Sequence, residues 1–173
     1  MQKRRVYLAL GSNLGDRRAH LRHALEELRD CGVQVDAVSA LYETPPWGVL
    51  DQPAFLNIAV GGESDLDARA LLVLAKRIEA AHGRDFAAGR WTARPLDIDI
   101  ALIEGETVDE PDLIVPHVLL TERSFVLVPL ADVAGDVLHP HLARPIAALR
   151  DTRPQAERDE VVRVAEVGWE RAN

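Results

Sequence analysis

The segment from Arg94 to Ile100 holds the side chains best suited to chemistry, because Asp97 and Asp99 are spaced as D-x-D. Successive side chains of a strand point to opposite faces, so the two carboxylates would share one face, about 6.5–7 Å apart. The apolar residues expected on the other face are Leu96, Ile98, Ile100 and Leu102. Two like charges this close repel unless a cation lies between them, and Mg²⁺ is the usual hard cation held by oxygen. The alternative is a solvated strand face, which an otherwise apolar strand disfavours.

A basic loop precedes the aspartates. Between Lys76 and Arg94 cations outnumber anions, although the whole chain has a formal charge of −8. The planar arginine guanidinium suits phosphate oxygens, and Trp91 offers a flat face to a base or a cation. The alternative is a solvated loop whose arginines pair with carboxylates elsewhere. Because this loop lies next to Asp97 and Asp99 in the sequence, phosphate binding is the favoured interpretation.

The common nucleotide and hydrolase motifs are absent. The sequence has no G-x-x-x-x-G-K-[ST], G-x-G-x-x-G, G-x-S-x-G, H-E-x-x-H or C-x-x-C. The stretch Gly11–Gly15 could approach an anion with its amides, but it is expected to be a plain tight turn. His139 and His141 have no third candidate ligand nearby in the sequence, so we expect a surface loop there.

Hydrophobic periodicity predicts the order β-α-β-β-α-β. That order predicts an α+β fold with a ferredoxin-like core, an antiparallel sheet with helices packed on it. A capping box over 64–67 is expected to open the second helix, and a further helix is expected over 126–133, with Pro129 near its start. The expected strands are 6–10, 33–42, 55–60 and 96–103, and the first helix is expected over 16–28.

Length and composition limit the remaining possibilities. With 173 residues, we expect a single catalytic domain over 1–150 and a peripheral C-terminal tail over 151–173. The acidic balance argues against a uniformly basic nucleic-acid binder. The one cysteine allows no intramolecular disulfide, and the N-terminal apolar run is too short for a signal peptide or a membrane span. We therefore expect a cytoplasmic monomer with neither nucleic acid nor membrane as a partner.

Several separate segments together resemble the 6-hydroxymethyl-7,8-dihydropterin pyrophosphokinase family of folate biosynthesis, over about residues 6 to 139. The signature stretch is Arg90-Trp91-Thr92-Ala93-Arg94-Pro95-Leu96-Asp97-Ile98-Asp99-Ile100. The other matching segments are 9–15, 42–48, 51–57, 77–79, 83–84, 115–117 and 122–125.

The resemblance implies transfer of pyrophosphate from ATP to the hydroxymethyl group of the pterin, with release of AMP. It implies that Asp97 and Asp99 hold two Mg²⁺ ions across the triphosphate, with Arg84 and Arg94 also catalytic. The residues implied to bind ATP are Glu79, Arg84, Trp91, Arg94, Ile100, His117 and Arg123. Those implied to line the pterin pocket are Gly11, Thr44, Pro45, Pro46, Trp47, Phe55, Asn57 and Phe125, with the two phenylalanines on either side of the ring.

Two alternatives from other classes remain open. One is a non-enzymatic ferredoxin-like domain that binds a small ligand, which the aspartate pair and the arginine-rich loop disfavour. The other is a Mg²⁺-dependent phosphodiesterase that uses the same carboxylates. A pterin pocket formed by Phe55, Asn57 and Phe125 would have no purpose in such an enzyme. Formation of AMP from ATP only when the pterin is present distinguishes the three.

Overall fold

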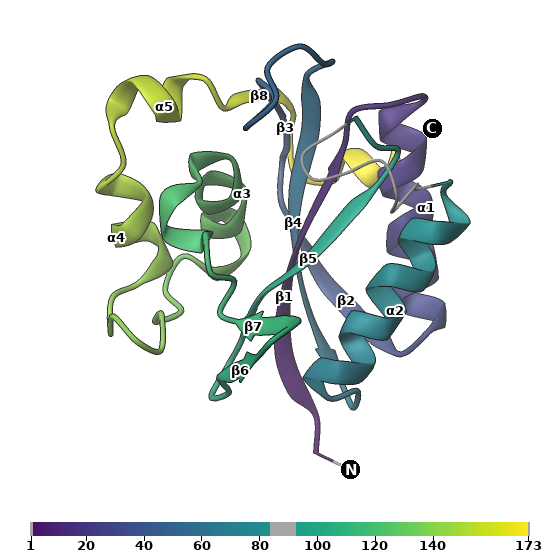
Figure 1. The fold of residues 1–173 in the computed structure, drawn as a ribbon, viewed down its shortest axis with the longest axis vertical. Coiled ribbons are helices and arrows are strands. Elements are labelled where there is room, and N and C mark those ends of the chain that lie inside the picture. The colour runs from purple at the N-terminus through teal and green to yellow at the C-terminus, as the bar shows by residue number, and fades with distance from the viewer. Residues whose placement is uncertain (1, 84–92, 173) are drawn as a thin grey trace.

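A six-stranded antiparallel sheet forms the centre of the molecule (Figure 1). The computed structural model describes residues 2–83 and 93–172. The strands are β1 (Arg4–Ser12), β2 (Val33–Val38), β3 (Leu41–Thr44), β4 (Phe55–Ser64), β5 (Asp97–Ile103) and β8 (Val162–Ala165), with a separate hairpin of β6 (Val108–Glu110) and β7 (Leu113–Val115). Their order is β5-β1-β4-β3-β8, and β2 pairs with another stretch of β4. The predicted α+β, ferredoxin-like architecture is confirmed.

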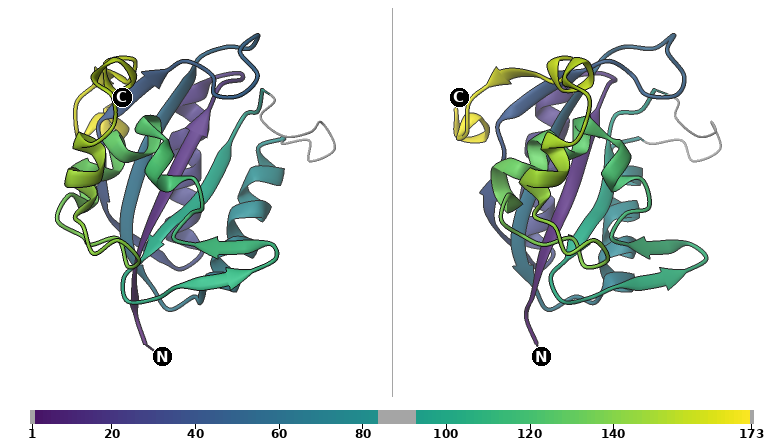
Figure 2. Two further views of the ribbon diagram at one scale, coloured as in Figure 1. Left: turned by 60° about the vertical axis from the view of Figure 1, so that its left-hand side comes forward. Right: turned by 90° about the vertical axis from the view of Figure 1, so that its left-hand side faces the viewer.

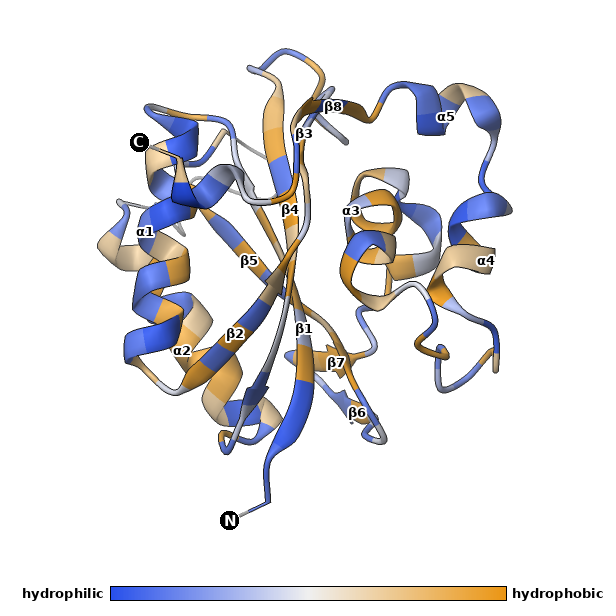
Figure 3. Ribbon diagram, turned by 180° about the vertical axis from the view of Figure 1, so that it is seen from behind, coloured by the Kyte–Doolittle hydropathy of each residue, from blue (hydrophilic) through white to orange (hydrophobic). Residues whose placement is uncertain are grey.

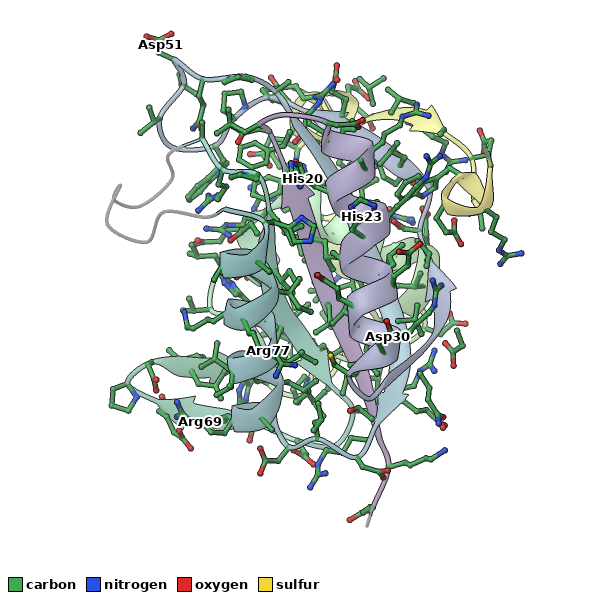
Figure 4. All side chains as sticks on the ribbon, turned by 90° about the vertical axis from the view of Figure 1, so that its right-hand side faces the viewer. His20, His23, Asp30, Asp51, Arg69 and Arg77 are labelled. Atoms are coloured by element: carbon green, nitrogen blue, oxygen red, sulfur yellow. The ribbon has the colours of Figure 1, made fainter. Side chains whose placement is uncertain are left out.

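Two helices of similar length cover one face of the sheet. They are α1 (Arg17–Asp30) and α2 (Ala68–Ala81). Figure 4 views this face and labels His20, His23 and Asp30 on α1 and Arg69 and Arg77 on α2. Alternate strand residues point toward these helices and form the larger core with their buried stripes. The strand residues that do so include Val6, Leu8, Leu10, Leu56, Ile58, Val60, Ile98 and Ile100, and Leu96 joins them from just before β5.

A shorter helix, α3 (Ser124–Ala134), packs on the opposite face. It is apolar around most of its circumference, as its mostly orange ribbon in Figure 3 shows, because the sheet lies on one side and α4 (Ile146–Asp151) on the other. The prediction that Pro129 lies near the start of this helix was wrong, because the helix begins at Ser124 and Pro129 lies inside it. The helix packs mainly on β4, and Phe125 in its first turn borders the pocket at the ends of β1, β4 and β5. Among the described residues, no helix has the length and apolar character that crossing a membrane requires.

One residue of β5 interrupts the expected alternation. Leu8 of β1 is opposite Ile100, whereas Tyr7 is opposite Leu102, so Ala101 is the extra residue of a β-bulge. The side chains beyond the bulge therefore exchange faces. Leu102 packs in the second core under α3 instead of sharing a face with Ile98 and Ile100, so that part of the prediction was wrong.

The single strand expected over 33–42 is two strands, β2 and β3. The break is at Ser39 and Ala40, where side-chain oxygen atoms instead of carbonyl groups accept hydrogen bonds from backbone amides. The Ala59 amide donates to Ser39 Oγ at 2.9 Å, and the Ala40 amide donates to Asp132 of α3 at 3.2 Å. Because both donors are satisfied outside a regular ladder, the chain can bend here and continue as a second strand along β4.

The start of α2 also differs from the prediction. Ser64 does not cap the helix, because it is the last residue of β4 and its hydroxyl donates to the Gly32 carbonyl. The N-cap is Asp67, whose carboxylate accepts from the Ala70 amide at 2.8 Å. A helix commonly begins with an aspartate N-cap whose carboxylate accepts from the backbone amide three residues later. The buried residues Leu71, Leu74, Ala75 and Ile78 form one apolar stripe along this helix.

The C-terminal segment crosses the edge of the sheet. From α5 (Gln155–Asp159) beside α3, the chain adds β8 to the edge strand β3 and ends with the 3₁₀ turn η3 (Trp169–Arg171), near α1 in Figure 1. Trp169 is only 5% exposed and belongs to the larger core, which the charged composition of this segment did not predict. Its indole Nε1 donates to the Ser39 carbonyl at 3.0 Å.

Replacement of this tryptophan tests how much the segment contributes to stability. We expect Trp169→Ala to lower the free energy of unfolding by about 3–5 kcal/mol, because a large buried ring and its hydrogen bond are lost together. Urea denaturation measures the change, and the Michaelis constants of the folded fraction should stay unchanged. A loss below about 1 kcal/mol would contradict the burial of the ring in the core.

Candidate active site

The candidate site lies on the sheet face not covered by α1 and α2, where three strand ends meet. Gly11 of β1 is directly opposite Asp97 of β5 on one side and Asn57 of β4 on the other. Residues opposite one another in a ladder point to the same face, so the carboxylate and the amide face the same space across the glycine. Phe55 and Asp99, each two residues along its strand, also point to this face.

Gly11 is required here by close approach. A Cβ atom at this position would lie 2.7 Å from Asn57 Oδ1 and 3.4 Å from the ring of Phe55. The first distance is shorter than side-chain atoms tolerate, so a larger residue would displace the amide. Asn57 Nδ2 donates in turn to Thr44 Oγ1 at 2.6 Å. The glycine therefore allows a fixed, buried amide that keeps its oxygen facing the pocket.

The two aspartates converge as their spacing predicted. Burial, followed by repulsion from Asp97, raises the pKa of Asp99 to about 8. Two neighbouring carboxylates that repel each other in a buried place suit a hard divalent cation, which would relieve the repulsion. No group of three or more acidic, histidine or cysteine side chains within residues 2–83 and 93–172 could hold a metal alone. A cation on this pair would therefore need oxygens from a bound phosphate or from water, which is how Mg²⁺ is usually held in phosphate sites.

His117 lies beside the pair, held by the bulge in β5. Its backbone amide donates to the carbonyl of the bulged residue Ala101 at 3.0 Å. Its ring Nδ1 accepts from the Leu119 amide at 3.1 Å, which leaves Nε2 to carry the proton, 3.8 Å from Asp99 Oδ1. Burial and the charge of Arg123 lower the pKa of this imidazole. The neutral ring can therefore present an N–H donor toward the aspartates.

A cleft of about 410 Å³ opens on the α2 side of the aspartates. Its volume suits a ligand of nucleotide size. Glu79 of α2 lines it and is held in place because its Oε1 accepts from the Ile98 amide at 2.7 Å. The residues that line this cleft are Leu72, Lys76, Glu79, Asp97, Ile98, Asp99, Ile100, Pro111, Asp112, Leu113, Ile114, His117 and Val118.

A second, narrow pocket of about 40 Å³ lies on the other side of Asp97. Two guanidinium groups lie over its aromatic rings. That of Arg123 is 4.7 Å from the ring centre of Trp47 and 5.5 Å from that of Phe125, and that of Arg94 is 5.8 Å from the centre of Phe55. The pocket is lined by Gly11, Thr44, Pro45, Trp47, Phe55, Asn57, Arg94, Asp97, Arg123 and Phe125. A flat two-ring ligand would need these cations to move aside.

Most of the expected site residues are brought together in these two cavities. Asp97 is shared between them. Arg94 and Arg123, expected at the triphosphate, line the aromatic pocket instead of the large cleft. Pro46 lines a third cavity, which Trp47 and Phe125 also line. Arg84 and Trp91 lie outside the described residues.

Sequence reasoning did not anticipate most of the walls of the large cleft. Leu72 and Lys76 come from α2, and Leu113 and Ile114 from the β6–β7 hairpin, which the sequence did not predict. The helical positions are four residues apart and could have indicated a shared face. The hairpin residues gave no comparable signal.

Comparison with known proteins identifies the family. The family model described as 7,8-dihydro-6-hydroxymethylpterin-pyrophosphokinase (HPPK) matches residues 7–135. A 2-amino-4-hydroxy-6-hydroxymethyldihydropteridine pyrophosphokinase from Methylorubrum extorquens is 47% identical over 135 residues, covering 78% of this chain and 85% of that protein. The protein of the same name from Bacillus subtilis is 45% identical over 133 residues, covering 76% of this chain and 79% of the relative.

Solved structures share the fold. The wild-type Plasmodium falciparum HPPK-DHPS bound to SDX-DHP superposes with a TM-score of 0.70 at 18% identity, over 87% of this chain and 44% of that chain. This chain thus spans less than half of that longer protein, and the likeness concerns the fold alone. The matched family model and these two relatives agree, and the chain belongs to the 7,8-dihydro-6-hydroxymethylpterin-pyrophosphokinase family.

Proposed function

We propose that this chain transfers the terminal pyrophosphoryl group of ATP to the hydroxymethyl group of 6-hydroxymethyl-7,8-dihydropterin and releases AMP, a step of folate biosynthesis. The hydroxymethyl oxygen forms a bond to the β-phosphorus of ATP, and the bond from that phosphorus to the oxygen bridging the α-phosphorus breaks. Such a transfer needs alignment and neutralisation of charge more than covalent help from the protein.

The observation that carries this proposal is the place of Asp97 between the two cavities. The large cleft has room for the nucleotide, and the aromatic pocket has flat faces for a pterin ring. Because one carboxylate lines both, a nucleotide in the first and a pterin in the second would bring their reacting ends together beside it. Asn57 can donate to and accept from the polar edge of the ring.

Asp97 and Asp99 are the proposed ligands of Mg²⁺, with two ions expected. When bound, the metal would neutralise charge on the phosphate oxygens. The arginines would add to that neutralisation. Arg94 Nε is buried and has no hydrogen-bond partner within the described residues, so it is a donor available to a phosphate oxygen. Arg84 and Trp91 remain proposed ATP contacts on the strength of the family resemblance.

Production of AMP tests the proposal against its alternatives. Purified protein with Mg²⁺ and ATP should form AMP only when the hydroxymethylpterin is added, with one pyrophosphorylated pterin for each AMP. AMP formed equally well without the pterin would indicate a phosphodiesterase. Binding of the pterin without any AMP would indicate a ligand-binding domain. We also propose the expected cytoplasmic location and monomeric state; size-exclusion chromatography with light scattering tests the latter.

Replacement of Phe125 tests the aromatic pocket. We expect Phe125→Ala to raise the dissociation constant of the pterin by about tenfold or more, because one flat face of the pocket is lost, and to leave binding of an ATP analogue within about twofold. Isothermal titration with each ligand measures both constants. Phe125 is only partly buried beside the second core, so thermal melting should change little. A large melting loss with unchanged pterin affinity would make Phe125 a core residue instead.

A further inference from the structure

Asn13 lies where three segments of the site meet, although it does not line either of the two cavities described above. It follows β1 by one residue, and its side chain is buried, with only 1% of the residue exposed. A buried amide must satisfy its donors and its acceptor, and the structure shows partners for both.

The first set of contacts fixes the backbone of Arg94. The Arg94 amide donates to Asn13 Oδ1 at 2.7 Å, and the Asn13 amide donates to the Arg94 carbonyl at 3.1 Å. Both backbone polar groups of Arg94 are therefore held by one residue. The Arg94 side chain extends from this fixed point over the ring of Phe55, with Nη1 at 3.9 Å from Asp97 Oδ1.

The second set of contacts fixes the loop between β3 and β4. Asn13 Nδ2 donates to the Pro53 carbonyl and to Gln52 Oε1, each at 3.0 Å. Pro53 comes two residues before Phe55, where β4 begins. Gln52 Nε2 donates to the Val49 carbonyl, so it continues the connection toward the tip of the loop. Figure 4 labels Asp51 at that tip, and Figure 2 shows the loop rising beyond the strand ends.

These partners require asparagine. The Arg94 amide can only donate and the Pro53 carbonyl can only accept, so the side chain at position 13 must accept on one atom and donate on the other. Aspartate has almost the same shape but no donor. In its place a carboxylate oxygen would face the Pro53 carbonyl and repel it.

We infer that Asn13 is a positioning residue that holds Arg94 and the start of β4 in a fixed relation to each other. The inference rests on the proposed roles of Arg94 at the phosphates and of Phe55 at the pterin. Its effect would be on transfer, because a reacting group displaced by about 1 Å can lose about 10²-fold in rate.

The test compares three variants by steady-state kinetics, with each substrate varied in turn while the other is saturating. Asn13→Asp should lower kcat by about 10²-fold and raise the KM of the pterin several-fold, while the KM of ATP changes less than threefold. Gln52→Ala removes the bonds of the Gln52 side chain to Asn13 and to the Val49 carbonyl, and it leaves the bonds of Asn13 to Arg94 and Pro53. It should raise the KM of the pterin and keep kcat within about threefold, since the contacts on Arg94 remain. Arg94→Ala tests the proposed function itself and should lower kcat at least as much as Asn13→Asp.

The outcomes separate failure of this inference from failure of the proposed function. A parental kcat in Asn13→Asp together with a low kcat in Arg94→Ala would overturn the positioning role alone. Parental kcat in Arg94→Ala would instead remove the proposed role of that arginine. Ile146→Val, at the start of α4 in the second core, is the stability control and should lower the melting temperature without changing kcat. If Asn13→Asp does not fold, the test depends on Gln52→Ala, for which we expect a raised pterin KM and a nearly parental kcat. An unchanged pterin KM in this variant would overturn the inference.

Discussion

Asp97→Asn and Asp99→Asn should each lower kcat by about 10³-fold or more at ordinary Mg²⁺ concentrations. Each change keeps the shape of the side chain but removes one of the two charges proposed to hold the metal. A metal ion commonly supplies several kcal/mol of charge stabilisation in the transition state, and about 4 kcal/mol corresponds to 10³-fold in rate. Steady-state AMP formation over a range of Mg²⁺ concentrations measures the effect.

Although these replacements should lower kcat, replacement of Asp99 by asparagine should not lower the stability of the fold. Burial and repulsion raise the pKa of Asp99 to about 8, well above its value of 3.8 in a model compound, so the folded state disfavours the charged carboxylate at neutral pH. Without Mg²⁺, Asp99→Asn should therefore melt at the same temperature as the parent or higher. Asp30→Asn, exposed at the end of α1, is the matched control and should leave kcat unchanged. Near-parental turnover in either site variant would exclude the metal assignment.

The sequence predicted which residues form the site better than it predicted the course of the strands and loops around it. Alternation along a strand depends only on local geometry, and it placed Asp97 and Asp99 together on the face opposite Ile98. The same rule failed at Leu102, because the bulge at Ala101 is a property of two paired strands. No pattern within the sequence of β5 alone indicates at which residue a bulge interrupts its pairing with β1.

Long-range hydrogen bonds account for the other differences. The break between β2 and β3 depends on Asp132, which comes from a helix far along the chain. Asn13 belongs to a stretch that we interpreted as a tight turn, and its role depends on Arg94 and Pro53, which are distant in sequence. Such contacts are set by tertiary packing, so local propensity and periodicity do not contain them.

Arg123→Ala should lower kcat by about 10²–10³-fold, the second largest effect we expect. Arg123 directly precedes α3, and its residue is only 9% exposed. Its guanidinium lies over Trp47 and Phe125, yet its charge also opposes the rise in the pKa of Asp99 and adds to the effect of burial that lowers the pKa of His117. The same cation therefore acts on the aromatic pocket and on the aspartates. Removing one fixed group that stabilises developing charge commonly costs about 10²–10³-fold in kcat.

Arg123→Lys distinguishes the shape of the cation from its charge. Lysine keeps the positive charge but is a point charge without the planar group that stacks on rings and binds two phosphate oxygens at once. We therefore expect less than about tenfold recovery of kcat relative to the alanine variant. Arg29→Ala, exposed in the last turn of α1, is the control for loss of an arginine and should keep parental kcat. Full recovery with lysine would mean that charge alone is needed at this position. A kcat within threefold of the parent in Arg123→Ala would mean that the guanidinium serves only to pack against the rings of Trp47 and Phe125.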